Sequence, residues 1–193
     1  EYCVERVGLN LAANGVAVEN ASGDAAAFAD AVQKVRSTAD LPLVLISPNP
    51  AAFAQPLEII AREKPLLYAA DAKNWEAMAE VAKKYNVPLA VKAENGDLSA
   101  LATLTDELTK VGVNDLVLDP GVRSLSGSLE VMTEVRRLAL RKNFRPLGFP
   151  MITFPGEGAG SPLEEATVAA QHIAKYGGVV VLDHFDPSLI YPL

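Results

Sequence analysis

The chain has 193 residues, of which 50% are hydrophobic and 21% charged, a balance typical of one folded domain with a substantial core. Its formal net charge of −7 argues against a nucleic-acid-binding surface, because phosphate contacts require clustered cations. The densest basic cluster, Arg136, Arg137, Arg141 and Lys142, falls on a predicted helix and is interpreted as a solvated helix face.

The single cysteine excludes an intrachain disulfide and a self-contained iron–sulfur cluster, which needs about four thiolates. No apolar run approaches the ~20 residues that span a bilayer. The chain opens with Glu1, Tyr2 and Cys3, without an initiator Met or the basic start of a signal peptide. We therefore expect a cytoplasmic protein that does not contact membranes.

The predicted elements alternate between short apolar runs and amphipathic helices. Residues 3–13 carry Cys3, Val7 and Leu11 at helical spacing, which predicts the last turns of a helix with Cys3 as a buried filler. Seven apolar runs follow, which begin 23 to 33 residues apart, at 16–18, 43–46, 66–68, 89–91, 116–118, 149–152 and 179–182. Well-marked helices are predicted at 24–38, 72–85, 98–111 and 125–142, and another opens at Ser161.

Two segments are less regular. Residues 50–63 contain Pro56, which kinks or delays a helix. Residues 187–193 begin a helix after Asp186 and reach the last residue, Leu193. A partial helix at each end predicts a segment cut from a longer chain.

Alternation of this kind predicts an α/β fold with a parallel sheet covered by helices. Seven strands are one short of a (β/α)₈ TIM barrel, so we expect a single TIM-barrel domain over 1–193 with seven of its eight strands. An open doubly wound sheet is the alternative. It is less favoured because no G-x-G-x-x-G loop follows any strand.

Functional side chains of a barrel lie at the carboxyl ends of its strands. The polar residues predicted there are Glu19, Asn20, Ser22, Ser47, Asn49, Asp71, Lys92, Glu94, Asn95, Asp119, Thr153, Glu157, Asp183 and His184. No paired histidines or cysteines have metal-ligand spacing, and no G-x-S-x-G nucleophile motif occurs. We therefore assign no catalytic and no metal-binding residue.

Asn20 and Asp119 are the candidate cofactor-binding residues. Asp119 precedes Pro120 and Gly121, where its carboxylate could accept hydrogen bonds from a polar heterocycle or cap the amides of its own turn. Asn20 has the same two interpretations. His184 could face a cofactor, although a turn residue is favoured, and the glycine-rich loop at 158–161 could bind an anion at a helix N-terminus or simply be flexible.

Several runs resemble a known family. Residues 64–70 (KPLLYAA), 116–122 (LVLDPGV) and 144–150 (FRPLGFP), together with 20–24 (NASGD) and 41–47 (LPLVLIS), are similar to the large (gamma) subunit of the corrinoid iron–sulfur protein. That protein belongs to the acetyl-CoA synthase/decarbonylase (CO dehydrogenase) system. The resemblance covers essentially the whole chain, in order.

The resemblance implies a methyl carrier of the reductive acetyl-CoA pathway. Its large subunit has an N-terminal [4Fe–4S] domain, a central TIM barrel and a C-terminal corrinoid domain, and this chain is similar to the barrel alone. A cobalamin-type corrinoid takes a methyl group from a methyltetrahydropterin through a methyltransferase and delivers it to acetyl-CoA synthase. The implied partners are the small corrinoid-protein subunit, that methyltransferase and acetyl-CoA synthase.

Three functions stay open. The first is a scaffold within this methyltransferase system, in which the barrel itself is not catalytic. The second is a pterin-binding TIM-barrel methyltransferase, in which Asn20 and Asp119 would hydrogen-bond the pterin ring. The third is a stand-alone barrel with an unnamed substrate.

Overall fold

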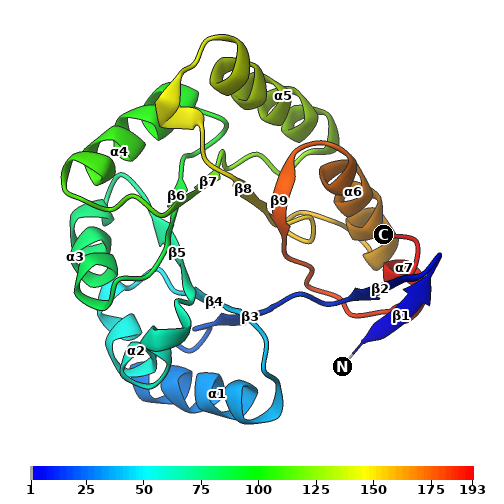
Figure 1. Ribbon diagram of the computed structural model, residues 1–193, viewed down its shortest axis with the longest axis horizontal. Helices are drawn as coiled ribbons and strands as arrows, with labels where there is room; N and C mark the ends of the chain where they lie inside the picture. Colours follow the sequence, from blue (N-terminus) through cyan, green and yellow to red (C-terminus); the bar gives the residue numbers. More distant parts are fainter. Residues whose placement is uncertain (1) are drawn as a thin grey trace. The chain divides into compact units, whose positions relative to one another are not determined.

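A computed structural model describes residues 2–193, which divide into two compact units (Figure 1). Unit 1 comprises the residues up to Ala70 together with Asn74–Leu89, and unit 2 comprises Asp71–Lys73 and Ala90–Leu193. Both units repeat the strand–helix alternation that the sequence predicts.

Unit 1 contains a parallel array of three strands and three covering helices. The strands are β3 (Val16–Glu19), β4 (Leu43–Ile46) and β5 (Leu66–Ala70), paired in that order. The helices α1 (Ala25–Thr38), α2 (Ala54–Ile60) and α3 (Trp75–Tyr85) lie along the outer side of these strands (Figure 1). Two 3₁₀ turns, Pro50–Phe53 and Ala61–Glu63, flank α2, and Pro56 lies within the first turn of this short helix, which continues past it.

The helix predicted for residues 3–13 is wrong. The strands β1 (Cys3–Arg6) and β2 (Leu9–Ala12) form an antiparallel hairpin in which Arg6 pairs with Leu9. Val7 and Gly8 both have positive φ, 51° and 77°, as a two-residue type I′ turn requires. The apolar residues that matched a helical period are instead those of two short strands, and Cys3 is exposed rather than buried.

Helix starts in unit 1 follow local capping. The Asp24 carboxylate accepts hydrogen bonds from the amides of Ala26 and Ala27, which fixes the start of α1. Helix α3 begins at Trp75 rather than near residue 72, because Asp71 caps a separate turn by accepting a hydrogen bond from the Lys73 amide.

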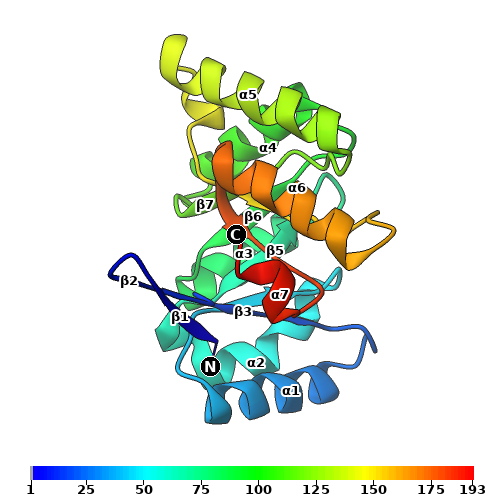
Figure 2. The same ribbon diagram turned by 90° about the vertical axis from the view of Figure 1, so that its right-hand side faces the viewer.

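Unit 2 continues the alternation. Its strands are β6 (Leu89–Lys92, of which Leu89 belongs to unit 1), β7 (Leu116–Asp119), β8 (Met151–Thr153) and β9 (Gly177–Val180), with β7–β8 and β8–β9 parallel. Its helices are α4 (Leu98–Lys110), α5 (Leu125–Arg141), α6 (Pro162–Ala174) and α7 (Pro187–Ile190), with a 3₁₀ turn at Arg145–Leu147. Helices α5 and α6 lie side by side, with β9 beside α6 (Figure 2). The predicted helix after Asp186 is α7, and the Asp186 carboxylate caps it.

The core of each unit lies between its strands and its helices. In unit 1, Leu45 and Leu67 from the strands and Phe53 and Leu57 from the outer layer are 0–1% exposed. In unit 2 the corresponding fully buried side chains include Leu101, Leu118, Met132 and Ile152. The two units together carry the seven parallel strands that the sequence predicts. Within residues 2–193, no helix is both long enough and apolar enough to cross a membrane.

Candidate functional site

Asn20 lies at the carboxyl end of β3, in unit 1. Asn20 is 6% exposed. Its backbone amide donates a hydrogen bond to the Ile46 carbonyl at 2.8 Å, which ties Asn20 to the end of β4. The Ser22 hydroxyl donates to Asn20 Oδ1 at 3.4 Å. Asn20 Nδ2, however, is buried without a hydrogen-bond partner among the described residues. A buried amide donor of this kind carries a desolvation cost that a ligand acceptor would remove.

Ser47 and Asn49 follow β4 in the same unit. Ser47 is 1% exposed, and its hydroxyl oxygen accepts a hydrogen bond from the Asn49 amide at 3.2 Å. Asn49 caps the following 3₁₀ turn through Ala51. Glu19 and Ser22 are exposed. Asn20 and Ser47 are thus the buried polar groups among these strand-end residues of unit 1.

Asp119, at the end of β7 in unit 2, is held by a buried ion pair. Arg123 donates from Nη1 to Asp119 Oδ1 at 2.9 Å and from Nη2 to Oδ2 at 2.8 Å, a two-pronged contact. The Gly121 amide also donates to Oδ1, at 2.8 Å. Asp119 is 1% exposed. The carboxylate therefore caps its own turn, as one of the two interpretations predicted, and also pairs with a guanidinium.

Arg123 extends this contact to the end of β8. Its Nε hydrogen-bonds Glu157, and its guanidinium carbon lies 5.5 Å from the centre of the Phe154 ring. The chain passes closely here, because a Cβ at Gly121 would overlap the Ala93 carbonyl oxygen. These contacts make the loops after β6, β7 and β8 one packed structure.

A second group of charges follows β9. Glu165 of α6 is 2% exposed and accepts hydrogen bonds from the Asp183 backbone amide and, at 2.7 Å, from His184 Nδ1. Partial burial and the nearby carboxylates of Glu165 and Glu157 raise the pKa of Asp183 above its usual value. His184 thus lies in the turn after β9, where the buried carboxylate of Glu165 holds its imidazole.

Helices α5 and α6 share a buried polar contact. His172 Nε2 lies 3.0 Å from Ser128 Oγ, and Gln171 donates to the same oxygen at 3.2 Å. Because the Ser128 hydroxyl gives its proton to the Leu125 carbonyl, His172 is the donor through Nε2. Burial, with a smaller contribution from the Arg123 charge, lowers the pKa of His172.

Several residues of these networks were not predicted from sequence, among them Arg123, Glu165 and Ser128. Arg123 lies four positions after Asp119 in a loop, and that spacing was its one sequence signal. Glu165 and Ser128 are polar residues on the buried faces of amphipathic helices. Asn20 and Asp119 belong to different units, and their binding of a cofactor stays a prediction.

The residues do not fit an iron–sulfur cluster. Such a cluster takes about four thiolates, and the chain has one cysteine, exposed on β1. Across the described part of the chain, no three His, Cys, Asp or Glu side chains gather as a metal site would require.

Solved structures of dihydropteroate synthases share this fold. The enzyme from Xanthomonas albilineans with 4-aminobenzoic acid superposes with a TM-score of 0.63 at 12% identity, over 93% of this chain and 77% of that one. A structure from Mycobacterium tuberculosis, Rv1207, superposes with a TM-score of 0.62 over 93% and 78%. These likenesses confirm the predicted TIM-barrel fold class.

Sequence relatives carry the names that the resemblance predicted. The corrinoid/iron-sulfur protein large subunit of Moorella thermoacetica is 41% identical over 98% of this chain. The acetyl-CoA decarbonylase/synthase complex subunit gamma 1 of Methanosarcina mazei is 35% identical over 96%. The chain spans 42% of the length of each of these two relatives.

A family model covers the full chain. Its description is CO dehydrogenase/acetyl-CoA synthase delta subunit, and it matches residues 1–193. The predicted resemblance to this enzyme system is thereby confirmed, and the chain belongs to the CO dehydrogenase/acetyl-CoA synthase delta subunit family.

Proposed function

We propose that this chain is the barrel segment of a corrinoid iron–sulfur methyl carrier. The observation that carries the proposal is the 41% identity to a corrinoid/iron-sulfur protein large subunit over 98% of the chain. Since the chain spans 42% of that relative, the proposal places a [4Fe–4S] domain before it and a corrinoid domain after it in the longer protein. When bound there, the corrinoid would supply the cobalt that carries the methyl group.

The role proposed for the segment itself is structural. The strand-end charges of unit 2 pair with one another, Asp119 with Arg123 and Arg123 with Glu157. The two-pronged pair of Arg123 with the buried Asp119 holds the two side chains in one relative orientation. A rigid set of loops suits a scaffold against which mobile cofactor domains and a small subunit dock.

The test uses the full-length protein that contains this segment, purified without oxygen together with its small subunit. We expect about one cobalt and four iron atoms per heterodimer, by analogy with the named relatives. After reduction of the cobalt by an added low-potential reductant, we expect a change in the visible corrinoid spectrum on adding methyltetrahydrofolate and a methyltransferase. A full-length protein with neither cobalt nor a methyl-dependent spectral change would contradict the proposal.

A pterin-binding barrel is the second candidate, favoured by the unpartnered Asn20 Nδ2 at the end of β3. A pterin offers ring nitrogens and a carbonyl oxygen that can accept this hydrogen bond. Calorimetric titration with methyltetrahydrofolate should then show binding that Asn20→Ala weakens about tenfold, the cost of one lost buried hydrogen bond.

Asn10→Ala is the matched control, because Asn10 is an exposed asparagine of unit 1 on β2. Asp119→Asn tests the other candidate residue. The pterin function is excluded if methyltetrahydrofolate does not bind, and the role of Asn20 in it is excluded if Asn20→Ala and Asn10→Ala bind methyltetrahydrofolate equally well.

A further inference from the structure

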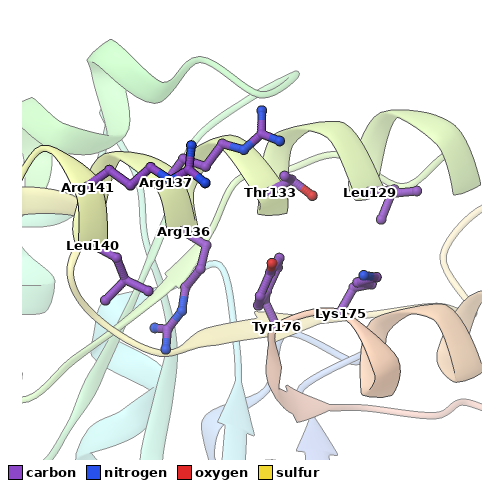
Figure 3. Close-up of a pocket in the computed structure, with 8 residues that line it drawn as sticks. All are labelled: Leu129, Thr133, Arg136, Arg137, Leu140, Arg141, Lys175 and Tyr176. Atoms are coloured by element: carbon purple, nitrogen blue, oxygen red, sulfur yellow. The ribbon is translucent and has the colours of Figure 1, made fainter.

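Helix α5 presents a second apolar face that its own unit leaves uncovered. The buried face of the helix carries Met132 and Val135. On another face, Leu129 and Leu140 are 36% and 63% exposed, and Tyr176, just beyond α6, is 44% exposed. These side chains line a groove of about 580 Å³ between α5 and the segment at Lys175–Tyr176. We call it the α5 groove (Figure 3).

Four cations surround this groove. Arg136, Arg137 and Arg141 come from α5, and Lys175 comes from the opposite wall. Figure 3 shows Lys175 and Tyr176 directed toward α5, with Arg136 extending from the helix on the same side. None of the four cations forms an ion pair within residues 2–193.

The arrangement differs from an ordinary solvated helix face. Like charges four residues apart, such as Arg137 and Arg141, destabilise a helix, and acidic residues at the same spacing are the usual remedy. Here the cations surround exposed leucines and a tyrosine, in a chain whose net charge is −7. Apolar side chains ringed by unpaired cations are complementary to a surface of apolar and acidic side chains.

We propose that the α5 groove docks an acidic, amphipathic segment of a partner subunit. Its apolar side chains would cover Leu129, Leu140 and Tyr176, and its carboxylates would pair with the surrounding cations. The 13 residues from Leu129 to Arg141 extend about 18 Å along the helix. That length exceeds a single phosphate group and fits a peptide segment. This inference rests on the proposed function in one respect, because it takes the partner to be a subunit of the methyl-carrier assembly.

The experiment compares two charge-reversal variants of the full-length protein in its complex. One carries Arg136→Glu, Arg137→Glu and Arg141→Glu. The control carries Lys34→Glu, Arg62→Glu and Lys83→Glu, which reverse three exposed cations of unit 1. The groove variant should bind the small subunit at least roughly 30-fold more weakly than wild type does, and the control variant should bind it within about threefold of wild type. Cobalt content is measured in parallel for each protein.

Hydrogen exchange and salt separate the possible outcomes. The amides of α5 should exchange more slowly in the complex, and wild-type affinity should fall as added salt screens the charges. Leu140→Ser, at an exposed position, should weaken binding about fivefold without lowering the melting temperature. This variant tests the apolar contact independently of the charges.

The docking proposal is overturned if the two charge-reversal variants bind the small subunit with equal affinity, or if the amides of α5 exchange at the same rate in the complex. A normal cobalt content in the same proteins leaves the proposed function standing. Tripolyphosphate is added as a probe of small anions. If it binds wild type and Leu140→Ser equally, and the small subunit does not slow exchange of the α5 amides, the groove is a small-anion site and the docking proposal is overturned. A full-length protein that binds no subunit overturns it as well, whereas the proposed function fails separately, on absent cobalt.

Discussion

At the level of single residues, Asp119 and Arg123 form an ion pair in unit 2 whose side chains are 1% and 19% exposed. Arg123→Met should cost about 3–5 kcal/mol of the free energy of unfolding, because it removes the guanidinium that donates two hydrogen bonds to a carboxylate that is 1% exposed. Urea unfolding followed by circular dichroism measures the loss.

The matched control is Arg36→Met in unit 1. Arg36 pairs with Asp40 and Glu63 at the surface, so its removal should destabilise the protein far less than removal of Arg123 does. Similar losses for the two variants would show that the Asp119 pair is no stronger than a surface pair.

His172 makes the stability of unit 2 depend on pH. Burial lowers its pKa below the 6.5 of an unfolded chain, so the unfolded state binds more protons as the pH falls. Stability should therefore be constant above about pH 6.5 and should fall below it until the lower pKa of the folded state is reached, by ~1.4 kcal/mol per unit of pKa difference.

Melting temperatures between about pH 7.5 and pH 5 measure this effect. His172→Gln should flatten the dependence in that window, because glutamine does not titrate. An equally steep dependence in His172→Gln would assign the effect to other groups.

At the level of elements, the turn after β7 depends on a glycine. Gly121 has a φ of 72°, and a Cβ there would overlap the Ala93 carbonyl oxygen. Gly121→Ala should destabilise by at least about 3 kcal/mol, since the backbone must move. Gly158→Ala, at a φ of 87° with open space around it, should cost only about 1 kcal/mol. Equal melting temperatures for the two variants would contradict this account.

The β1–β2 hairpin contains an unfavourable turn residue. Val7 adopts a φ of 51°, which a β-branched side chain resists and asparagine tolerates. Val7→Asn should slow hydrogen exchange of the β1 and β2 amides several-fold, whereas Val7→Ile should leave it unchanged. Faster exchange in Val7→Asn would argue against the type I′ turn.

At the level of the whole molecule, the strands β3 and β9 are where we expect association with other chains. Within unit 1, β3 pairs with β4 alone, and within unit 2, β9 pairs with β8 alone. Unpaired strand edges recruit other chains. We expect residues 1–193 by themselves to self-associate or to require a second chain, as measured by size-exclusion chromatography with light scattering. A soluble monomer that melts cooperatively would contradict this expectation.

Much of the fold could be predicted because its signals are local. Asp24 and Asp186 cap helices from neighbouring positions, and Pro56 lies in the first turn of α2, where proline is tolerated. The failure at residues 3–13 has the same origin. Apolar residues at positions 3, 7 and 11 suit a helix, but positive φ at Val7 and Gly8 reverses the chain into a hairpin.

The sequence by itself determined the seven parallel strands, most of the intervening helices and the family, because periodicity, capping and residue identity are carried by short stretches of chain. Only the tertiary structure decided which side chains meet. Arg123 reaches Glu157 across 34 residues and His172 reaches Ser128 across 44, and the α5 groove joins residues 129–141 to Lys175 and Tyr176. Contacts between distant positions depend on how helices pack against strands, which no local pattern in the chain encodes.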